Sequence, residues 1–148
     1  MTEQTPSESD EGLRRFDVEL FIVHPTLDPA DITAELGLEP AGSHRVGDPR
    51  QTPRKALLPG KYRDTHWRHC VELELRNQWF AEEVTKLVDR LLPHKAFLRN
   101  IRATGGKAQI IVQFFDAYYG DEISRETLAK LVDLELDLGI ECFSDSRS

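Results

Sequence analysis

Basic side chains concentrate between His44 and His69, in a chain that is otherwise acidic. That window contains seven basic and two acidic residues, so its formal charge is +5, whereas the whole chain carries −7. The guanidinium groups of arginine form paired hydrogen bonds with carboxylates and phosphates. The window therefore predicts a binding surface for an acidic protein or for a small anionic ligand. Its bases are Arg45, Arg50, Arg54, Lys55, Lys61, Arg63 and Arg68, and its acids are Asp48 and Asp64.

The candidate ligand- or partner-binding residues are Arg45, Asp48, Arg50, Arg54, Arg63, Trp67 and Arg68. The ring of Trp67 could stack on a flat ligand or on an arginine, as could the ring of Tyr62. If the ligand is a small anion, we expect one cleft to be lined by Arg45, Asp48, Trp67 and Arg68. A plainer alternative stays open, in which the arginines are solvated and pair with the acidic surface of the chain itself.

Histidine and cysteine form no recognisable metal or catalytic pattern. His66 and His69 lie on an expected strand at a spacing that points their side chains to opposite faces. Cys70 lacks both a glycine-flanked turn and an orienting histidine signature. Gly105-Gly106-Lys107 leads from an expected helix into a strand, whereas a phosphate-binding loop leads from a strand into a helix. We therefore expect no catalytic residue, no metal and no cofactor.

Composition predicts the compartment and excludes some partners. Residues 1–13 are polar and acidic, which is typical of a disordered tail and unlike a secretory signal. No apolar run approaches the length of a membrane helix, and the net negative charge disfavours nucleic acid. We expect a cytoplasmic protein in which Cys70 and Cys142 are reduced, half-buried thiols.

Strand and helix patterns alternate along the chain. Strands are expected at 16–22, 43–46, 67–75, 107–115 and 140–143, and helices at 28–37, 77–93, 97–105 and 124–139. Residues 47–64 are rich in proline and glycine and predict a long irregular loop. The element order predicts a single α+β domain over 14–148. Its expected architecture is a ferredoxin-like α/β sandwich, with a mostly antiparallel sheet and helices on one face.

Several residues in sequence order also resemble the bacterial domain of unknown function family 4279. The matching residues are Phe21, Leu27-Asp28-Pro29 with Ile32, Leu36-Gly37-Leu38 with Pro40, Arg45 with Gly47-Asp48, and Trp67. The resemblance covers residues from about 16 to 143. The family has no assigned activity, so the resemblance implies no catalytic residue. One departure is Glu141, where the family pattern leads us to expect aspartate.

These observations support two hypotheses of function. The first is a non-enzymatic protein-interaction module, immunity-like or regulatory, because the chain is small, acidic and without a reaction signature. The alternative is a binding domain for a small anionic ligand, or an enzyme acting on one, through the basic loop. Self-association through an exposed strand edge is a further way in which the chain could bind a protein partner.

Overall fold

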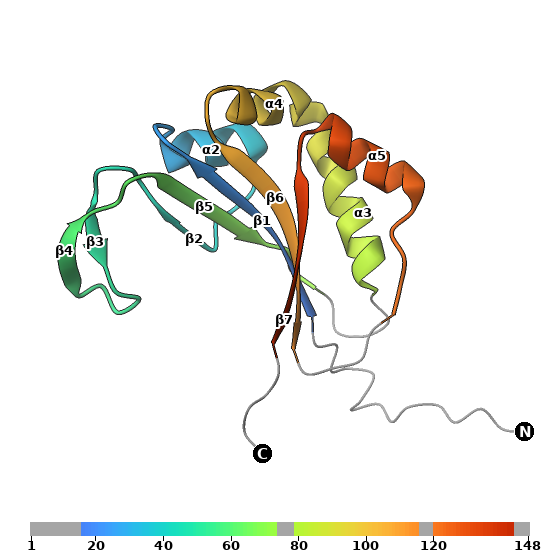
Figure 1. The fold of residues 1–148 in the computed structure, drawn as a ribbon, viewed down its shortest axis with the longest axis horizontal. Helices are drawn as coiled ribbons and strands as arrows, with labels where there is room; N and C mark the ends of the chain where they lie inside the picture. The colour runs from blue at the N-terminus through green and yellow to red at the C-terminus, as the bar shows by residue number, and fades with distance from the viewer. Residues whose placement is uncertain (1–15, 74–78, 116–119, 144–148) are drawn as a thin grey trace, which may run out of the picture.

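The computed structural model describes residues 16–73, 79–115 and 120–143, which form an α+β fold (Figure 1). The expected tail at 1–13 and the first two residues of the helix expected at 77–93 lie outside the described residues. The strands are β1 (Phe16–His24), β2 (Gly42–His44), β3 (Pro49–Gln51), β4 (Leu57–Lys61), β5 (Thr65–Cys70), β6 (Lys107–Phe115) and β7 (Asp137–Phe143). The helices are α2 (Pro29–Leu36), α3 (Phe80–Leu91), α4 (Lys95–Ala103) and α5 (Arg125–Asp133), with a short 3₁₀ turn (Leu92–His94) before α4.

Five strands form one mixed sheet in the order β2-β5-β1-β6-β7. All neighbours are antiparallel except β6 and β7, which run parallel because α5 connects them. The ferredoxin-like topology predicted from the element order is not confirmed. Element order leaves several strand arrangements open, and only the pairing of distant strands selects one of them.

The helices cover one face of this sheet, and the core lies between the two layers (Figure 1). Side chains alternate between the faces along each strand. Val18, Leu20 and Ile22 of β1 therefore point into the core, together with Trp67 of β5 and Ile110 of β6. The residues between them, such as those that flank Leu20, lie on the opposite face. That open face is where the β5 and β2 side chains described below are found.

The expected loop at 47–64 contains a second, two-stranded sheet. β3 pairs with β4 in antiparallel fashion, with Pro49 opposite Lys61 and Gln51 opposite Leu57. The prediction of a wholly irregular segment is therefore wrong. The strands escape sequence analysis because every residue of both is exposed, so no alternation of apolar and polar side chains marks them.

Local signals set several element ends. Asp28 caps α2 by accepting the backbone N–H of Ala30, and Gly37 ends that helix in the left-handed conformation. Helix α5 ends at Asp133. Two residues later, Glu135 takes a positive φ of 57°, which no α-helix continues through. The helix therefore stops before Gly139, which lies inside β7, contrary to the sequence prediction.

Two further predictions concern surface and burial. No helix in the described ranges is long and apolar enough to cross a membrane. Cys70 and Cys142 are free, as expected for reduced thiols, but both residues are exposed rather than half-buried.

Candidate functional site

The β3–β4 hairpin projects from the main sheet as an arm (Figure 1). We call residues 49–63 the basic arm. Its base is closed by two backbone hydrogen bonds, from Gly47 N–H to Tyr62 O at 2.9 Å and from Tyr62 N–H to Asp48 O at 2.9 Å. These bonds join the two ends of the arm to each other, and they therefore fix the position at which the arm leaves the main sheet.

The tip of the arm is also ordered by hydrogen bonds. The Thr52 hydroxyl accepts the backbone N–H of Ala56, and the Thr52 carbonyl accepts the N–H of Lys55. Lys55 takes a positive φ of 67° to close this turn. The Tyr62 hydroxyl accepts the backbone N–H of Gln51 at 3.1 Å. The arm is therefore an ordered hairpin, and its side chains project from defined positions.

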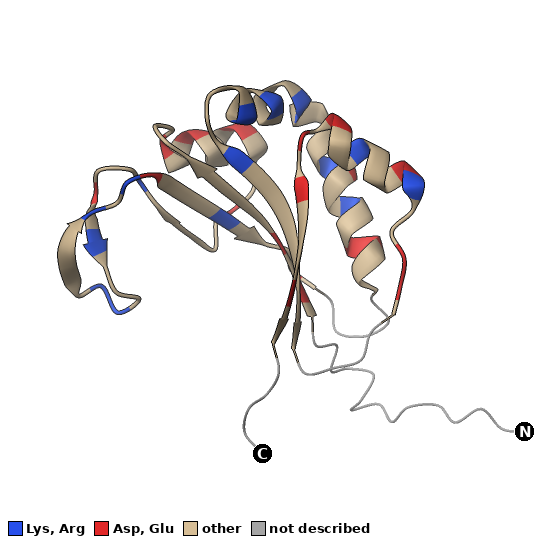
Figure 2. Cartoon of the chain, viewed as in Figure 1, with Lys and Arg blue, Asp and Glu red and all other residues tan. Residues whose placement is uncertain are grey.

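Five cationic side chains lie exposed on the arm: Arg50, Arg54, Lys55, Lys61 and Arg63. Among the residues that the structure describes, none of these five forms an ion pair. Within the described ranges, the one hydrogen bond formed by these side chains runs from Arg50 Nη1 to the carbonyl of Pro59, at 3.2 Å. Cations near α4 behave differently, because Lys95 and Arg99 both pair with Asp133. Figure 2 shows the basic positions of the arm apart from those on the helices.

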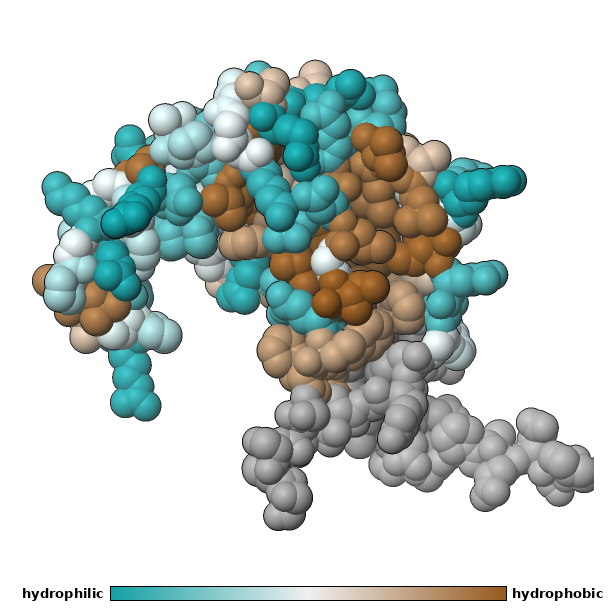
Figure 3. All heavy atoms as spheres, in the orientation of Figure 1, coloured by the Kyte–Doolittle hydropathy of each residue, from teal (hydrophilic) through white to brown (hydrophobic). Residues whose placement is uncertain are grey.

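Two leucines stand among the charges of the arm. Leu57 is 72% exposed and Leu58 is 37% exposed, and both belong to β4. A hydrophobic patch is visible on the arm in Figure 3. Exposed apolar residues surrounded by charged residues are typical of protein-binding surfaces.

The remaining candidate residues do not line one cleft. Trp67 is completely buried under α2, and its Nε1–H donates to the Thr33 hydroxyl at 3.0 Å. Arg68, the next residue on β5, points to the opposite face and lies 3.6 Å from the Glu19 carboxylate. Arg45 lies 3.6 Å from Asp28, at the start of α2. Trp67 is therefore a core residue, and its buried ring is closed to the ligand stacking expected from the sequence.

A pocket of about 660 Å³ lies beside α3 rather than beside the arm. It is bounded by the chain from Gly37 to Ala41, the end of β5, and α3. Its polar lining mixes both charges, with Glu83, Lys86 and Arg90 on the helix side. No residue of the basic arm borders it, so the pocket and the arm are separate features.

The residue pairing of β2 with β5 brings together a group that sequence analysis missed. His44 lies directly opposite His66, and Asp64 precedes β5 by one residue. The Tyr62 ring stacks on His44, with ring centres 3.5 Å apart and planes 7° apart. Only the closeness of Tyr62, Asp64 and His66 in sequence hinted at this cluster.

The Cys70 thiol is held in its protonated form. Although the residue as a whole is exposed, partial desolvation of the thiol and the neighbouring Glu19 carboxylate raise the pKa of Cys70, and Arg68 opposes them only in part. Its Sγ–H donates to Glu19 Oε2 at 3.6 Å. A thiol with a raised pKa is a weak nucleophile, because the thiolate is the reactive form.

Fold and site together define a small α+β domain that carries a protruding basic hairpin beside a helix-covered sheet. The chain belongs to the family described as Domain of unknown function (DUF4279), whose model matches residues 14–143. The family resemblance predicted from Phe21, Asp28-Pro29, Gly37 and Trp67 is therefore confirmed. Neither the comparison with curated proteins nor that with solved structures gave a match.

Proposed function

We propose that this protein is a non-enzymatic binding module, immunity-like or regulatory, whose basic arm docks on an acidic surface of a protein partner. The observation that carries the proposal is the set of five exposed cations without an ion pair in the described part of the chain. They stand on a hairpin that leaves the main sheet (Figure 2). Charges placed in this way add little to the stability of the fold, and they remain available to a partner.

The partner's chemistry follows from the arm. Arginine and lysine side chains favour a surface rich in Asp and Glu, and arginine can bind a carboxylate through two hydrogen bonds. Leu57, the more exposed of the two leucines, calls for a small apolar contact within that acidic surface. Complementary charge of this kind speeds and orients the encounter more than it increases affinity.

The order of the arm supports the same proposal. Backbone hydrogen bonds close its base, and Thr52 orders its tip. A binding segment that is already ordered loses less conformational entropy when it docks. By contrast, the described residues give the small anionic ligand less support, since Trp67 is buried and the pocket beside α3 lies apart from the arm.

The test is affinity enrichment from a lysate of the native host, followed by binding measurements on the purified partner. The bait is the full chain, compared with Arg54→Glu and with a variant in which residues 49–61 are replaced by a two-residue turn. We expect both changes to remove the same acidic partner. For that purified partner, Arg54→Glu should lower the association rate about tenfold at low salt, with a smaller effect at high salt.

Arg125→Glu is the matched control, because Arg125 is an exposed cation on α5, outside the arm. This variant changes the net charge equally, so it should retain the partner. Identical partner lists for the wild type and the arm variants, or the absence of any partner, would refute the proposal. Equal loss with Arg125→Glu would show that net charge, rather than the arm, governs binding.

A further inference from the structure

Three side chains with metal-binding atoms converge at the root of the basic arm. They are His44 at the end of β2, Asp64 just before β5, and His66 on β5. One ligand atom from each residue lies within 4.8 Å of the other two. His66 Nε2 and Asp64 Oδ1 are 3.0 Å apart.

These separations suit a single small cation. Zn²⁺ binds imidazole nitrogen at about 2.0–2.1 Å and carboxylate oxygen at about 2.0–2.2 Å, which places two tetrahedral ligands about 3.3 Å apart. The His66–Asp64 separation already has that size. Rotation of the His44 side chain through a short distance would bring the third ligand into range.

The backbone and neighbouring rings hold the two imidazoles in place. His44 and His66 are opposite residues of paired strands, and their ring centres lie 4.3 Å apart. The Tyr62 ring stacks on the His44 ring, and the Phe21 and His66 rings pack at nearly right angles with centres 5.3 Å apart. These contacts keep both imidazoles beside Asp64, so that binding an ion requires only a small rotation of His44 within the row of rings.

We propose that His44, Asp64 and His66 form a binding site for one divalent transition-metal ion, represented here by Zn²⁺. Two imidazoles and one carboxylate are ligands that such ions prefer, and three protein ligands leave a coordination position for water or another molecule. The side chains of His66 and Asp64 are 40% and 41% exposed, so an ion can reach them from solvent. The site joins β2 to β5 and does not depend on the docking of the arm.

The test is a calorimetric titration of the full-length, tag-free protein with Zn²⁺. The metal content of the protein after dialysis is a second measurement. We expect one Zn²⁺ per chain and a higher melting temperature in its presence. His44→Phe keeps a ring for stacking but removes the ligand, and Asp64→Asn keeps the shape of the side chain. Each should weaken Zn²⁺ binding at least about tenfold.

His94→Gln is the control for the loss of a histidine elsewhere, and Cys70→Ser/Cys142→Ser is the control for binding by the exposed thiols. Both should bind one Zn²⁺ as tightly as the wild type. His66→Phe adds a third ligand variant, so a folding defect in one variant, detected by circular dichroism, does not end the test. The proposal is overturned if the wild type shows no saturable site. It is also overturned if the folded ligand variants bind as the wild type does, or if the cysteine control loses the ion.

Discussion

His24 is a buried histidine that holds the turn after β1. Its Nδ1 accepts the backbone N–H groups of Thr26 at 3.1 Å and Leu27 at 3.0 Å. Since Nδ1 is an acceptor, the proton is on Nε2, which donates to the Thr104 hydroxyl at 2.7 Å. Burial lowers the pKa of His24, so the folded state keeps this ring neutral.

This arrangement predicts acid sensitivity. The unfolded state, with an ordinary histidine pKa of 6.5, takes up the proton before the folded state does. The free energy of unfolding should therefore fall as pH drops below about 6.5, with His44 contributing in the same direction. His24→Ala should lower the free energy of unfolding by about 1–3 kcal/mol at pH 7.5, because two backbone N–H groups lose their acceptor.

Urea denaturation at pH 7.5 and 5.5 measures both effects. The variant should lose less stability than the wild type between these two pH values. Parallel losses in the two proteins would contradict the assignment of the neutral ring to His24.

Glu19 is a carboxylate buried on the open face of the sheet. Burial raises its pKa, while Arg68 and the Cys70 thiol partly compensate. Arg68 therefore offsets the cost of a charge that the strand pairing places out of solvent, where a lone carboxylate is unfavourable.

We predict that Arg68→Gln destabilises the protein by about 1 kcal/mol at neutral pH and by less at pH 4. At neutral pH the variant leaves the Glu19 charge without its cation, whereas at pH 4 a carboxyl with a raised pKa is protonated. Denaturation of the variant and of Glu19→Gln/Arg68→Gln at both pH values is the measurement. The double variant should lack this pH dependence, and an equal cost of Arg68→Gln at both pH values would show that Arg68 acts by packing alone.

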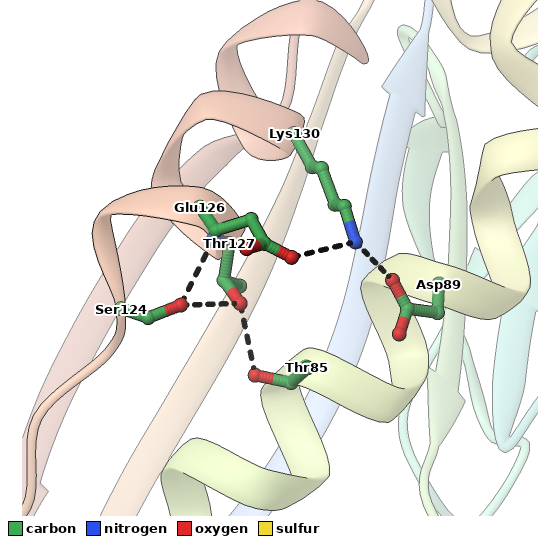
Figure 4. A network of polar contacts seen from close by, with 6 residues as sticks. All are labelled: Thr85, Asp89, Ser124, Glu126, Thr127 and Lys130. Atoms are coloured by element: carbon green, nitrogen blue, oxygen red, sulfur yellow. Dashed lines mark hydrogen bonds and ion pairs between the residues drawn. The ribbon is translucent and has the colours of Figure 1, made fainter.

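At the scale of elements, polar contacts fasten α5 to α3 (Figure 4). Ser124 caps α5 by accepting the N–H of Thr127 at 3.1 Å, and its hydroxyl donates to the Thr127 hydroxyl. Thr127 in turn shares a hydrogen bond with Thr85 of α3 at 3.0 Å. One turn further along, Lys130 reaches Asp89 of α3 at 2.9 Å. The network sets how α5 lies on α3 before the chain enters β7.

Ser124→Ala should therefore cost about 1 kcal/mol in the free energy of unfolding, because the first turn of α5 loses its cap. Ser124→Asp keeps an acceptor at the same position and should be close to the wild type. Thermal denaturation of the two variants is the check. Equal destabilisation by Ala and Asp would assign the effect to the Ser124–Thr127 hydroxyl contact rather than to capping.

At the scale of the whole molecule, the basic arm is an appendage to the folded core. β3 and β4 pair with each other and not with the five-stranded sheet, and every residue of both strands is exposed. The hydrogen bonds between Gly47, Asp48 and Tyr62 already bring the ends of the arm together. The core therefore does not need the arm in order to close.

Replacing residues 49–61 by a two-residue turn should lower the free energy of unfolding by about 1 kcal/mol or less, because little apolar area is buried there. Urea denaturation and circular dichroism measure this directly. Loss of a cooperative transition would show that the arm contributes to the core, and it would disqualify the truncated chain as a bait for partner binding.

Sequence patterns were reliable where they act over a few neighbouring residues. Asp28, Pro29 and Gly37 predict the start and end of α2, because a cap, a fixed φ and a left-handed stop are local properties. The alternation along β1 predicts its core face. Trp67 shows the limit, since its type suggested stacking on a ligand and only packing under α2 reveals a core residue.

The sequence alone therefore determined the α+β class, most of the helices and strands, the family resemblance and the basic window. Tertiary structure decided which distant residues meet. The pairing of β2 with β5 places His44 opposite His66, although 22 positions separate them in sequence. The packing of α2 on the sheet likewise decides that the Trp67 face of β5 lies in the core, while Arg68 lies on the open face. Strand partners are selected by the packing of the whole core, which no short stretch of sequence encodes.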